Sequence, residues 1–174
     1  MTAAPANISD CRTSQRERDV WQILADVPDP EIPVLSVVEL GIIRYVRATD
    51  AGQVTVGVSP TYTGCPATEV IANSIKSRLE AEGFHEPTVE SVLAPAWTSD
   101  WLTDSAHAKL KEYGIAPPAH SVGNPKHLWR EPNVACPRCA SMQTAKISEF
   151  ASTPCKALYR CSSCLEPFEY FKCI

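Results

Sequence analysis

The pattern of apolar and polar positions predicts a helix near the N-terminus. Ser14 and Glu17 have the spacing of a capping box, in which each side chain accepts a hydrogen bond from the other residue's backbone N–H. Beyond them, apolar residues recur every three or four positions, which is the period of one helical face. Pro28 cannot continue a helix and ends it. The expected buried face consists of Val20, Ile23, Leu24 and Val27.

The pattern then changes to the two-residue period of β-strands. We expect strands at about 42–48 and 53–59, joined by a turn-forming sequence at 49–52. A loop at 61–66 leads into a second helix that stops at Gly83, a residue suited to helix C-termini. The apolar positions expected in the core here are Val54, Val56 and Val58 of the second strand and Ile71, Ile75 and Leu79 of the helix.

A third strand is expected at about 88–93 and a last helix at about 99–113, closed by Gly114. The order helix–strand–strand–helix–strand–helix predicts an α+β fold, with a small mixed sheet covered by helices. The side chains expected in the core of this last region are Trp97, Trp101, Leu102, Ala106, Leu110 and Tyr113.

These elements divide the chain into four expected parts. Residues 1–13 have no periodicity and are expected to form a disordered arm. Residues 14–114 form the α+β domain, and 115–133, which contain four prolines, form an extended linker. Residues 134–174 form a small all-β ribbon.

Composition narrows the classes of protein. The chain has 174 residues, of which 44% are hydrophobic, and a formal net charge of −4, which does not favour a nucleic-acid partner. It contains no run of about 18 apolar residues, and its N-terminus does not have the pattern of a signal peptide. We therefore expect no membrane span and a cytoplasmic protein with reduced thiols.

Two C-x2-C pairs in the ribbon carry the strongest chemical signal. Cys136 and Cys139 form the first pair, Cys161 and Cys164 the second, and 21 residues separate them. Two such turns can hold one tetrahedral ion between four thiolates, which suits a structural Zn²⁺ with no open position for catalysis. Disulfides and an iron–sulfur centre are the alternatives.

Other ribbon residues have simpler interpretations. Cys155 and Cys173 are expected to be small apolar filler, with a role as an additional metal ligand as the alternative. Phe168, Tyr170 and Phe171 are expected in the last strand, with an exposed contact patch as the alternative.

Cys65 is the most interesting residue of the larger domain. It stands where a loop meets a helix N-terminus, a setting that stabilises a thiolate. Together with Asp29, Glu31 and Thr61 it could form a mixed site for iron, whereas an inert buried cysteine is the simpler alternative. A nucleophilic enzyme would need a nearby base. None of the four histidines, His85, His107, His120 and His127, stands in a recognisable catalytic motif.

Two segments of the larger domain resemble a known family. Residues 29–33, Asp-Pro-Glu-Ile-Pro, followed by Val-Val-Glu-Leu-Gly at 37–41, are similar to the opening signature of the iron–sulfur cluster assembly (FSCA) domain family. Thr-Tyr-Thr-Gly-Cys-Pro at 61–66 resembles the family's second motif, whose cysteine is Cys65 here.

Further segments narrow the resemblance. Residues 95–101, 113–118 and the ribbon end at 161–174 are similar to the PaaJ family, the D subunits of phenylacetyl-CoA epoxidase, a multicomponent system of aerobic phenylacetate catabolism. The resemblance implies a non-catalytic accessory protein that assists assembly or repair of the complex's iron or iron–sulfur centres. Cys65 would hold iron or a cluster transiently, and the partners would be the oxygenase or reductase components. A purely bridging role is the alternative, and a homodimer stays open.

Overall fold

The computed structural model describes residues 14–49, 51–62, 64, 67–118 and 133–172. The predicted arm at 1–13, Cys65, Cys173 and most of the predicted linker lie outside these residues. The chain divides into two compact units. The N-terminal unit runs to Trp97 and includes Trp101–Thr103, and the C-terminal unit comprises Thr98–Asp100 and the chain from Asp104 onward.

The two helices of the N-terminal unit begin and end where local signals predict. Helix α1 spans Gln15–Ala25, and the capping box is present: Ser14 N–H donates to Glu17 Oε2 at 2.8 Å, and Glu17 N–H donates to Ser14 Oγ at 3.2 Å. Helix α2 spans Ala67–Ala81. Gly83, with φ of 89°, closes α2 with N–H bonds from Gly83 to the carbonyl of Glu80 and from Phe84 to that of Leu79.

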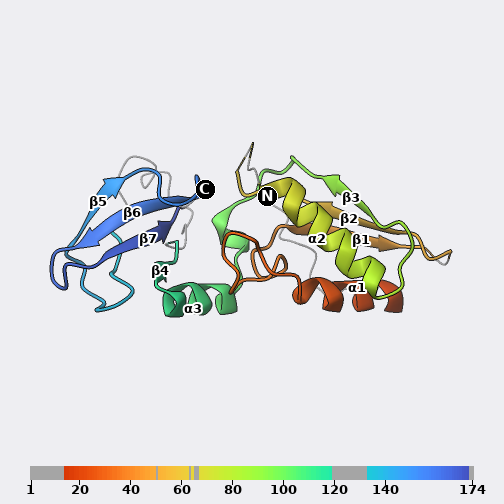
Figure 1. Cartoon of the computed structure of the whole chain (residues 1–174), viewed down its shortest axis with the longest axis horizontal. Coiled ribbons are helices and arrows are strands. Elements are labelled where there is room, and N and C mark those ends of the chain that lie inside the picture. Colours follow the sequence, from red (N-terminus) through yellow and green to blue (C-terminus); the bar gives the residue numbers. More distant parts are fainter. Residues whose placement is uncertain (1–13, 50, 63, 65–66, 119–132, 173–174) are drawn as a thin grey trace. The chain divides into compact units, whose positions relative to one another are not determined.

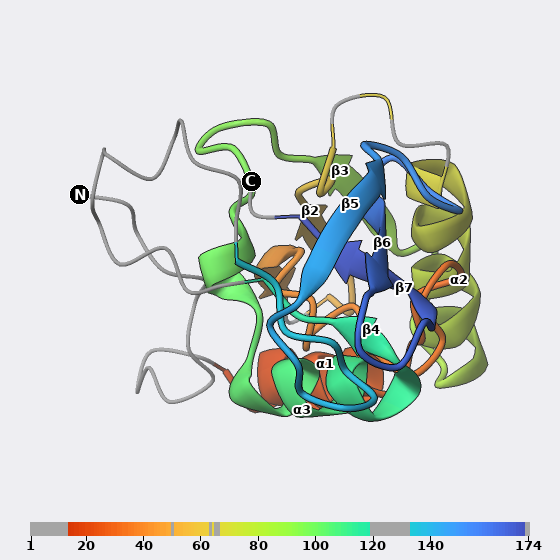
Figure 2. The same ribbon diagram turned by 90° about the vertical axis from the view of Figure 1, so that its left-hand side faces the viewer.

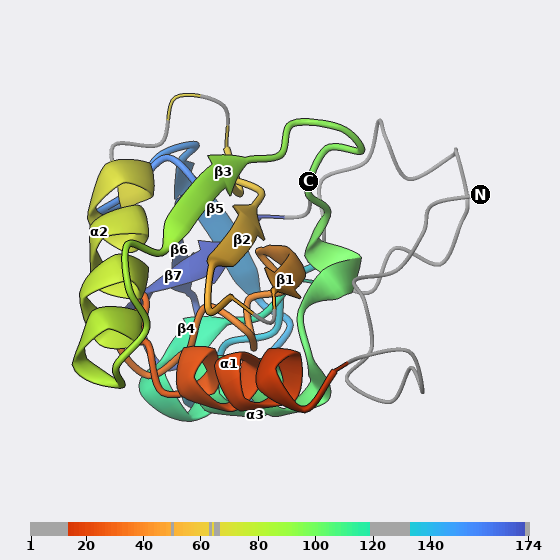
Figure 3. The same ribbon diagram turned by 90° about the vertical axis from the view of Figure 1, so that its right-hand side faces the viewer.

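The predicted mixed sheet is confirmed. Strands β1 (Ile43–Ala48), β2 (Val54–Val58) and β3 (Thr88–Ser91) lie in the order β1-β2-β3, with β1 antiparallel and β3 parallel to β2. Helices α1 and α2 lie on the same face of this sheet (Figures 1 and 3). The apolar side chains buried between the helices and the sheet include Val20, Leu24, Ile43, Val54, Val56, Ile75 and Leu79.

The structure between β3 and the ribbon differs from the predicted single helix at about 99–113. A short 3-10 helix, η1, covers Ser99–Trp101, and α3 starts only at Asp104 and ends at Tyr113. The break is stabilised by a tertiary bond, because the Thr103 N–H donates to the carbonyl of Glu39 at 3.1 Å. Tyr113 was expected in the core and this is wrong: it is the last residue of α3 and is 56% exposed.

The ribbon of the C-terminal unit is a four-stranded sheet (Figure 2). Its strands are β4 (Ile115–Ala116), β5 (Thr144–Ser148), β6 (Lys156–Cys161) and β7 (Pro167–Phe171), in the order β4-β7-β6-β5. Strand β4 pairs parallel to β7, so the first two residues of the predicted linker are part of this sheet. The ribbon core consists of Ala116, Val134, Cys136, Ala157, Tyr159, Cys161, Phe168 and Tyr170.

The aromatic residues of the last strand are buried in the ribbon and do not form an exposed patch. Phe168, Tyr170 and Phe171 lie in β7, as predicted, and each is at most 5% exposed. The alternative of an exposed contact patch at these residues is therefore wrong. None of the helices in the described parts of the chain combines the length and apolar character needed to cross a membrane.

Candidate metal centre

The four cysteines of the two C-x2-C pairs converge on one point. Their sulfur atoms all lie within 4.8 Å of one another. The Sγ atoms of Cys136 and Cys164 are 3.8 Å apart, and those of Cys139 and Cys161 are 3.6 Å apart. Cys136 and Cys161 are buried in the ribbon core, whereas Cys139 and Cys164 are exposed. The site therefore lies at the border between core and solvent.

These distances fit a single tetrahedral ion. Four thiolates at the usual Zn–S bond length of about 2.3 Å lie roughly 3.8 Å from one another at the corners of a tetrahedron. In an iron–sulfur cluster the thiolates bind different iron atoms and lie farther apart. The sulfurs are also too far apart for disulfides, whose S–S bond is about 2.05 Å. A structural metal held by four thiolates is the arrangement that the donor set supports.

The two halves of the site are built alike. In each half the N–H of the first cysteine donates to the carbonyl five residues later, from Cys136 to Ser141 at 2.9 Å and from Cys161 to Glu166 at 3.0 Å. In each half the residue after the second cysteine has a positive φ, 58° at Ala140 and 64° at Leu165. This backbone conformation is favoured by glycine, so both turns hold their side chains at an energetic cost.

Side chains join the two halves across the site. The hydroxyls of Ser141 and Ser163 are 2.7 Å apart, and the Arg138 guanidinium is 3.2 Å from the Glu166 carboxylate. The Arg138–Glu166 pair is exposed and contributes little stability by itself. It joins the first turn to the residues that follow the second turn.

The surroundings of the thiols shift their pKa values in opposite directions. Backbone N–H groups of Cys164 and Ser163 stabilise the Cys161 thiolate and lower the pKa of Cys161 to about 6. At Cys139 a backbone hydrogen bond from Ser141 acts in the same direction, but burial and the neighbouring thiols raise its pKa to about 12. A metal binds thiolates, so metal binding must displace the proton of a thiol with a raised pKa such as Cys139.

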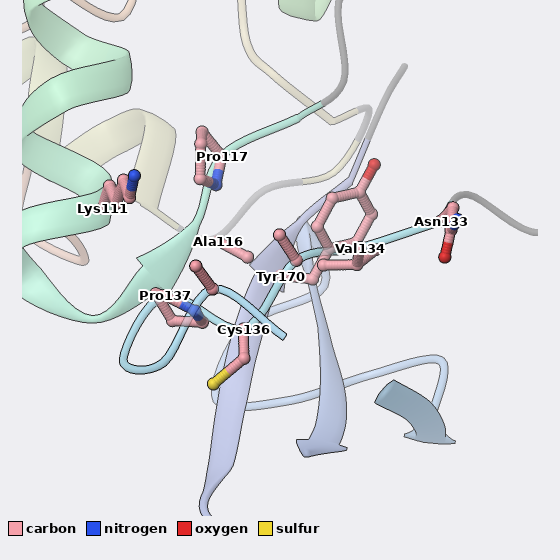
Figure 4. A pocket seen from close by; sticks show the side chains of 10 residues that line it. Lys111, Ala116, Pro117, Asn133, Val134, Cys136, Pro137 and Tyr170 are labelled. Atoms are coloured by element: carbon pink, nitrogen blue, oxygen red, sulfur yellow. The ribbon is translucent and has the colours of Figure 1, made fainter. Parts of the chain in front are cut away.

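A pocket of about 240 Å³ lies beside the first cysteine pair (Figure 4). Residues of the first metal-binding turn form part of its wall, so the shape of the pocket depends on the metal site. Its lining is mainly apolar, and Lys111, Asn133 and Tyr170 contribute polar groups. The lining residues are Lys111, Ala116, Pro117, Asn133, Val134, Ala135, Cys136, Pro137, Ala140 and Tyr170.

The predicted second site is only partly within the described residues. Asp29 is buried, and its Oδ1 accepts the N–H groups of Glu31 at 2.9 Å and Ile32 at 2.8 Å. Glu31 is half-buried in the same loop, and Thr61 is half-buried just after β2. Cys65 lies outside the described residues, two positions before α2 begins. Convergence of these four residues therefore stays a prediction.

The other cysteine and histidine candidates that the structure describes lie outside the four-cysteine group. Cys155 is buried, as predicted for apolar filler, and the four-cysteine group does not include it. Its thiol is 3.0 Å from the hydroxyl of Thr153. His85 is exposed and His107 is half-buried on α3. His120 and His127 lie outside the described residues.

The sequence pattern did not predict the position of one charged side chain in the N-terminal unit, that of Arg44. The Arg44 guanidinium lies 3.7 Å from the centre of the Trp101 ring, and its buried Nη1 has no hydrogen-bond partner in the described part of the chain. Burial lowers the pKa of Arg44. Arg44 and Trp101 are 57 positions apart, so no local pattern could have joined them.

The two parts of the chain match two known families. Residues 17–92 match a family described as iron–sulfur cluster assembly protein, and residues 121–172 match the PaaD zinc beta ribbon domain. A crystal structure of a domain of unknown function, DUF59, from Bacillus anthracis is 26% identical, with a TM-score of 0.51 over 54% of this chain and 90% of that one. Fold and site thus define an iron–sulfur assembly domain followed by a zinc ribbon.

Two proteins of similar sequence indicate more closely which family the chain belongs to. The candidate D subunit of 1,2-phenylacetyl-CoA epoxidase from Escherichia coli (strain K12) is 52% identical over 156 residues, 90% of this chain and 92% of the relative. An iron–sulfur protein maturation auxiliary factor of Porphyromonas gingivalis (strain ATCC BAA-308 / W83) is 33% identical over 97 residues, 55% of this chain and 91% of that protein. The chain belongs to the family of phenylacetyl-CoA epoxidase D subunits.

Proposed function

We propose that this chain is a non-catalytic accessory protein that assists assembly or repair of the iron or iron–sulfur centres of phenylacetyl-CoA epoxidase. One observation carries the proposal. The same chain matches an epoxidase component along most of its length and an iron–sulfur assembly family in its N-terminal part. A cytoplasmic location accords with the proposed role and with thiols that are kept available for metals.

The ribbon site has a structural role in this proposal. Four thiolates complete the coordination of Zn²⁺ and leave no position for a substrate. Zn²⁺ would hold the turns at Cys136–Cys139 and Cys161–Cys164 together, and the ribbon would then present a fixed surface to the client protein. The transferred iron or cluster is a cargo and binds elsewhere.

The cargo site in this proposal contains Cys65, with Asp29, Glu31 and Thr61 around it. The buried Asp29 carboxylate fixes the loop by accepting two backbone N–H groups, and this loop carries Glu31. A thiolate just before α2 would gain from the positive end of that helix. Thiolate and carboxylate ligands together form a mixed soft and hard donor set, which suits iron.

The experiment that tests the proposal is Cys65→Ser in cells that depend on this chain for growth on phenylacetate. We expect loss of growth with normal amounts of folded protein, and faster alkylation of wild-type Cys65 at pH 7 than of a thiol with the ordinary pKa of about 8.5. Full growth of the Cys65→Ser strain would support the second candidate, a bridging component, which the match to an epoxidase component also favours.

A further inference from the structure

We propose that the open edge of β5 docks an extended, acidic segment of a partner protein by strand addition. The inference rests on the proposed function, because it identifies the surface through which the ribbon would hold an epoxidase component. We call strand β5, with Phe150, Arg160 and Lys172 beside it, the β5 edge. It shares no residue with the four-cysteine site or with the loop of Asp29.

Strand β5 is an edge strand with an exposed isoleucine, Ile147. Among the described strands it pairs only with β6, so one side of its backbone has no strand partner. Exposed edges are normally protected by charges, bulges or a short strand. The register irregularity of β5 lies between Lys146 and Ser148, so its regular part is Thr144–Lys146. The Lys146 ammonium is paired with Glu149, and Ile147 beside it is 55% exposed. An added strand would therefore pair with Thr144–Lys146 and meet an apolar side chain at Ile147.

Phe150 adds a second apolar anchor that is held in place. Its side chain is 60% exposed, and its N–H donates to Ser148 Oγ at 3.2 Å. The Lys172 ammonium lies 4.5 Å from the centre of the ring and also donates to the carbonyl of Glu149 at 3.2 Å. An exposed aromatic ring fixed in this way loses little conformational entropy on binding.

The charges of the β5 edge define the chemistry of the partner. Lys146, Arg160 and Lys172 contribute three positive charges, and Glu149 contributes one negative charge. Arg160 lies next to the edge because it is paired with Ala145 of β5. An added strand with acidic side chains between apolar ones would satisfy the backbone, the apolar anchors and the charges together. A second copy of this chain would instead place the same positive charges against each other.

The test uses the full, zinc-loaded chain and separately purified epoxidase components. The variant Ile147→Lys places a charge on the edge without touching the ribbon core, and Leu93→Lys, at a 66% exposed leucine of the N-terminal unit, is the matched control. We expect Ile147→Lys to weaken binding to one component at least tenfold in calorimetry and Leu93→Lys to leave it unchanged. Bound wild-type chain should show slower hydrogen exchange at Thr144–Ser148, and binding should weaken with salt.

Several results would overturn the inference. These are equal binding by Ile147→Lys and wild type, no protection of β5 in the complex, or no binding of any epoxidase component by the wild type. A wild-type homodimer that Ile147→Lys dissociates would assign the β5 edge to a second copy. The proposed function is tested separately, since it concerns iron content and growth. An Ile147→Lys chain that restores epoxidase normally would leave that function intact and remove only this docking surface.

Discussion

Ala140 and Leu165 occupy equivalent positions in the two halves of the metal site. Each directly follows the second cysteine of its pair, and each has a positive φ, 58° and 64° respectively. The metal site therefore imposes an unfavourable backbone conformation twice, on residues other than glycine. Because Leu165 is 62% exposed, its side chain can be changed with little effect on packing.

The first prediction follows from this relationship. Leu165→Val should destabilise the zinc-loaded ribbon by about 1 kcal/mol or more, since a β-branched side chain tolerates a positive φ poorly. Leu165→Gly should be neutral or slightly stabilising, because the relief of strain offsets the greater freedom of the unfolded chain. Denaturant unfolding measures both, with Leu93→Val as an exposed control. Equal stability of the valine and glycine variants would contradict the account.

The second prediction concerns the ion pair of the ribbon. The Lys156 side chain is 4% exposed and its ammonium is 2.7 Å from the Glu169 carboxylate. Glu169→Gln should lower the free energy of unfolding by about 3 kcal/mol, because a buried ammonium loses its counter-ion. The double variant Lys156→Met with Glu169→Leu should be within about 1 kcal/mol of wild type. Glu149→Gln, at an exposed pair, should cost less than about 1 kcal/mol.

The pair also predicts a pH dependence. Burial by itself would raise the pKa of Glu169, but hydrogen bonds from Lys156 and Ser152 hold it below the usual range. A carboxylate with a lowered pKa stabilises the fold above its unfolded pKa of about 4.3 and loses this effect as the pH falls through the folded value. The difference between wild type and Glu169→Gln should therefore shrink as the pH falls below about 4.3. A difference that stays unchanged at acid pH would contradict the assignment.

The third prediction concerns the metal. The purified chain should contain about one Zn²⁺, and Cys136→Ser or chelation should unfold the ribbon while the N-terminal unit keeps its hydrogen-exchange protection. Metal binding contributes on the order of 10–16 kcal/mol in comparable peptides, which is more than a ribbon of this size can replace. Elemental analysis and hydrogen exchange measure the outcome. Iron in place of zinc, or a protected ribbon without metal, would contradict it.

The fourth prediction concerns the N-terminal unit. A Cβ added at Gly41 would lie 2.3 Å from the backbone oxygen of Trp101, whereas one at Gly83 meets nothing within 4 Å. Both glycines have a positive φ. Gly41→Ala should therefore cost about 2–4 kcal/mol, from backbone strain and overpacking together. Gly83→Ala should cost only about 1 kcal/mol. Similar losses in the two variants would show that the close contact with Trp101 is unimportant.

Local signals predicted the elements that depend on neighbouring residues. The capping box at Ser14 and the stop at Gly83 act within one helical turn, and the structure has both. The convergence of the four cysteine sulfurs could be predicted because a C-x2-C turn brings two thiols together whatever surrounds it.

Features that depend on distant residues were missed. Strand β4 is only two residues long and exists through pairing with β7, more than 50 positions later. The break before α3 includes the bond between the Thr103 N–H and the Glu39 carbonyl. Tyr113 was expected in the core and is exposed. The sequence pattern also contains nothing that brings Arg44 over the ring of Trp101.

We propose that this chain assists assembly or repair of the iron or iron–sulfur centres of a phenylacetyl-CoA epoxidase. The most direct measurement is the iron content and activity of epoxidase purified from cells that lack the chain, before and after addition of the chain with ferrous iron. We expect low iron and low activity in the epoxidase from these cells, with both partly restored by wild-type chain and not by Cys65→Ser. Full iron and full activity without the chain would contradict it.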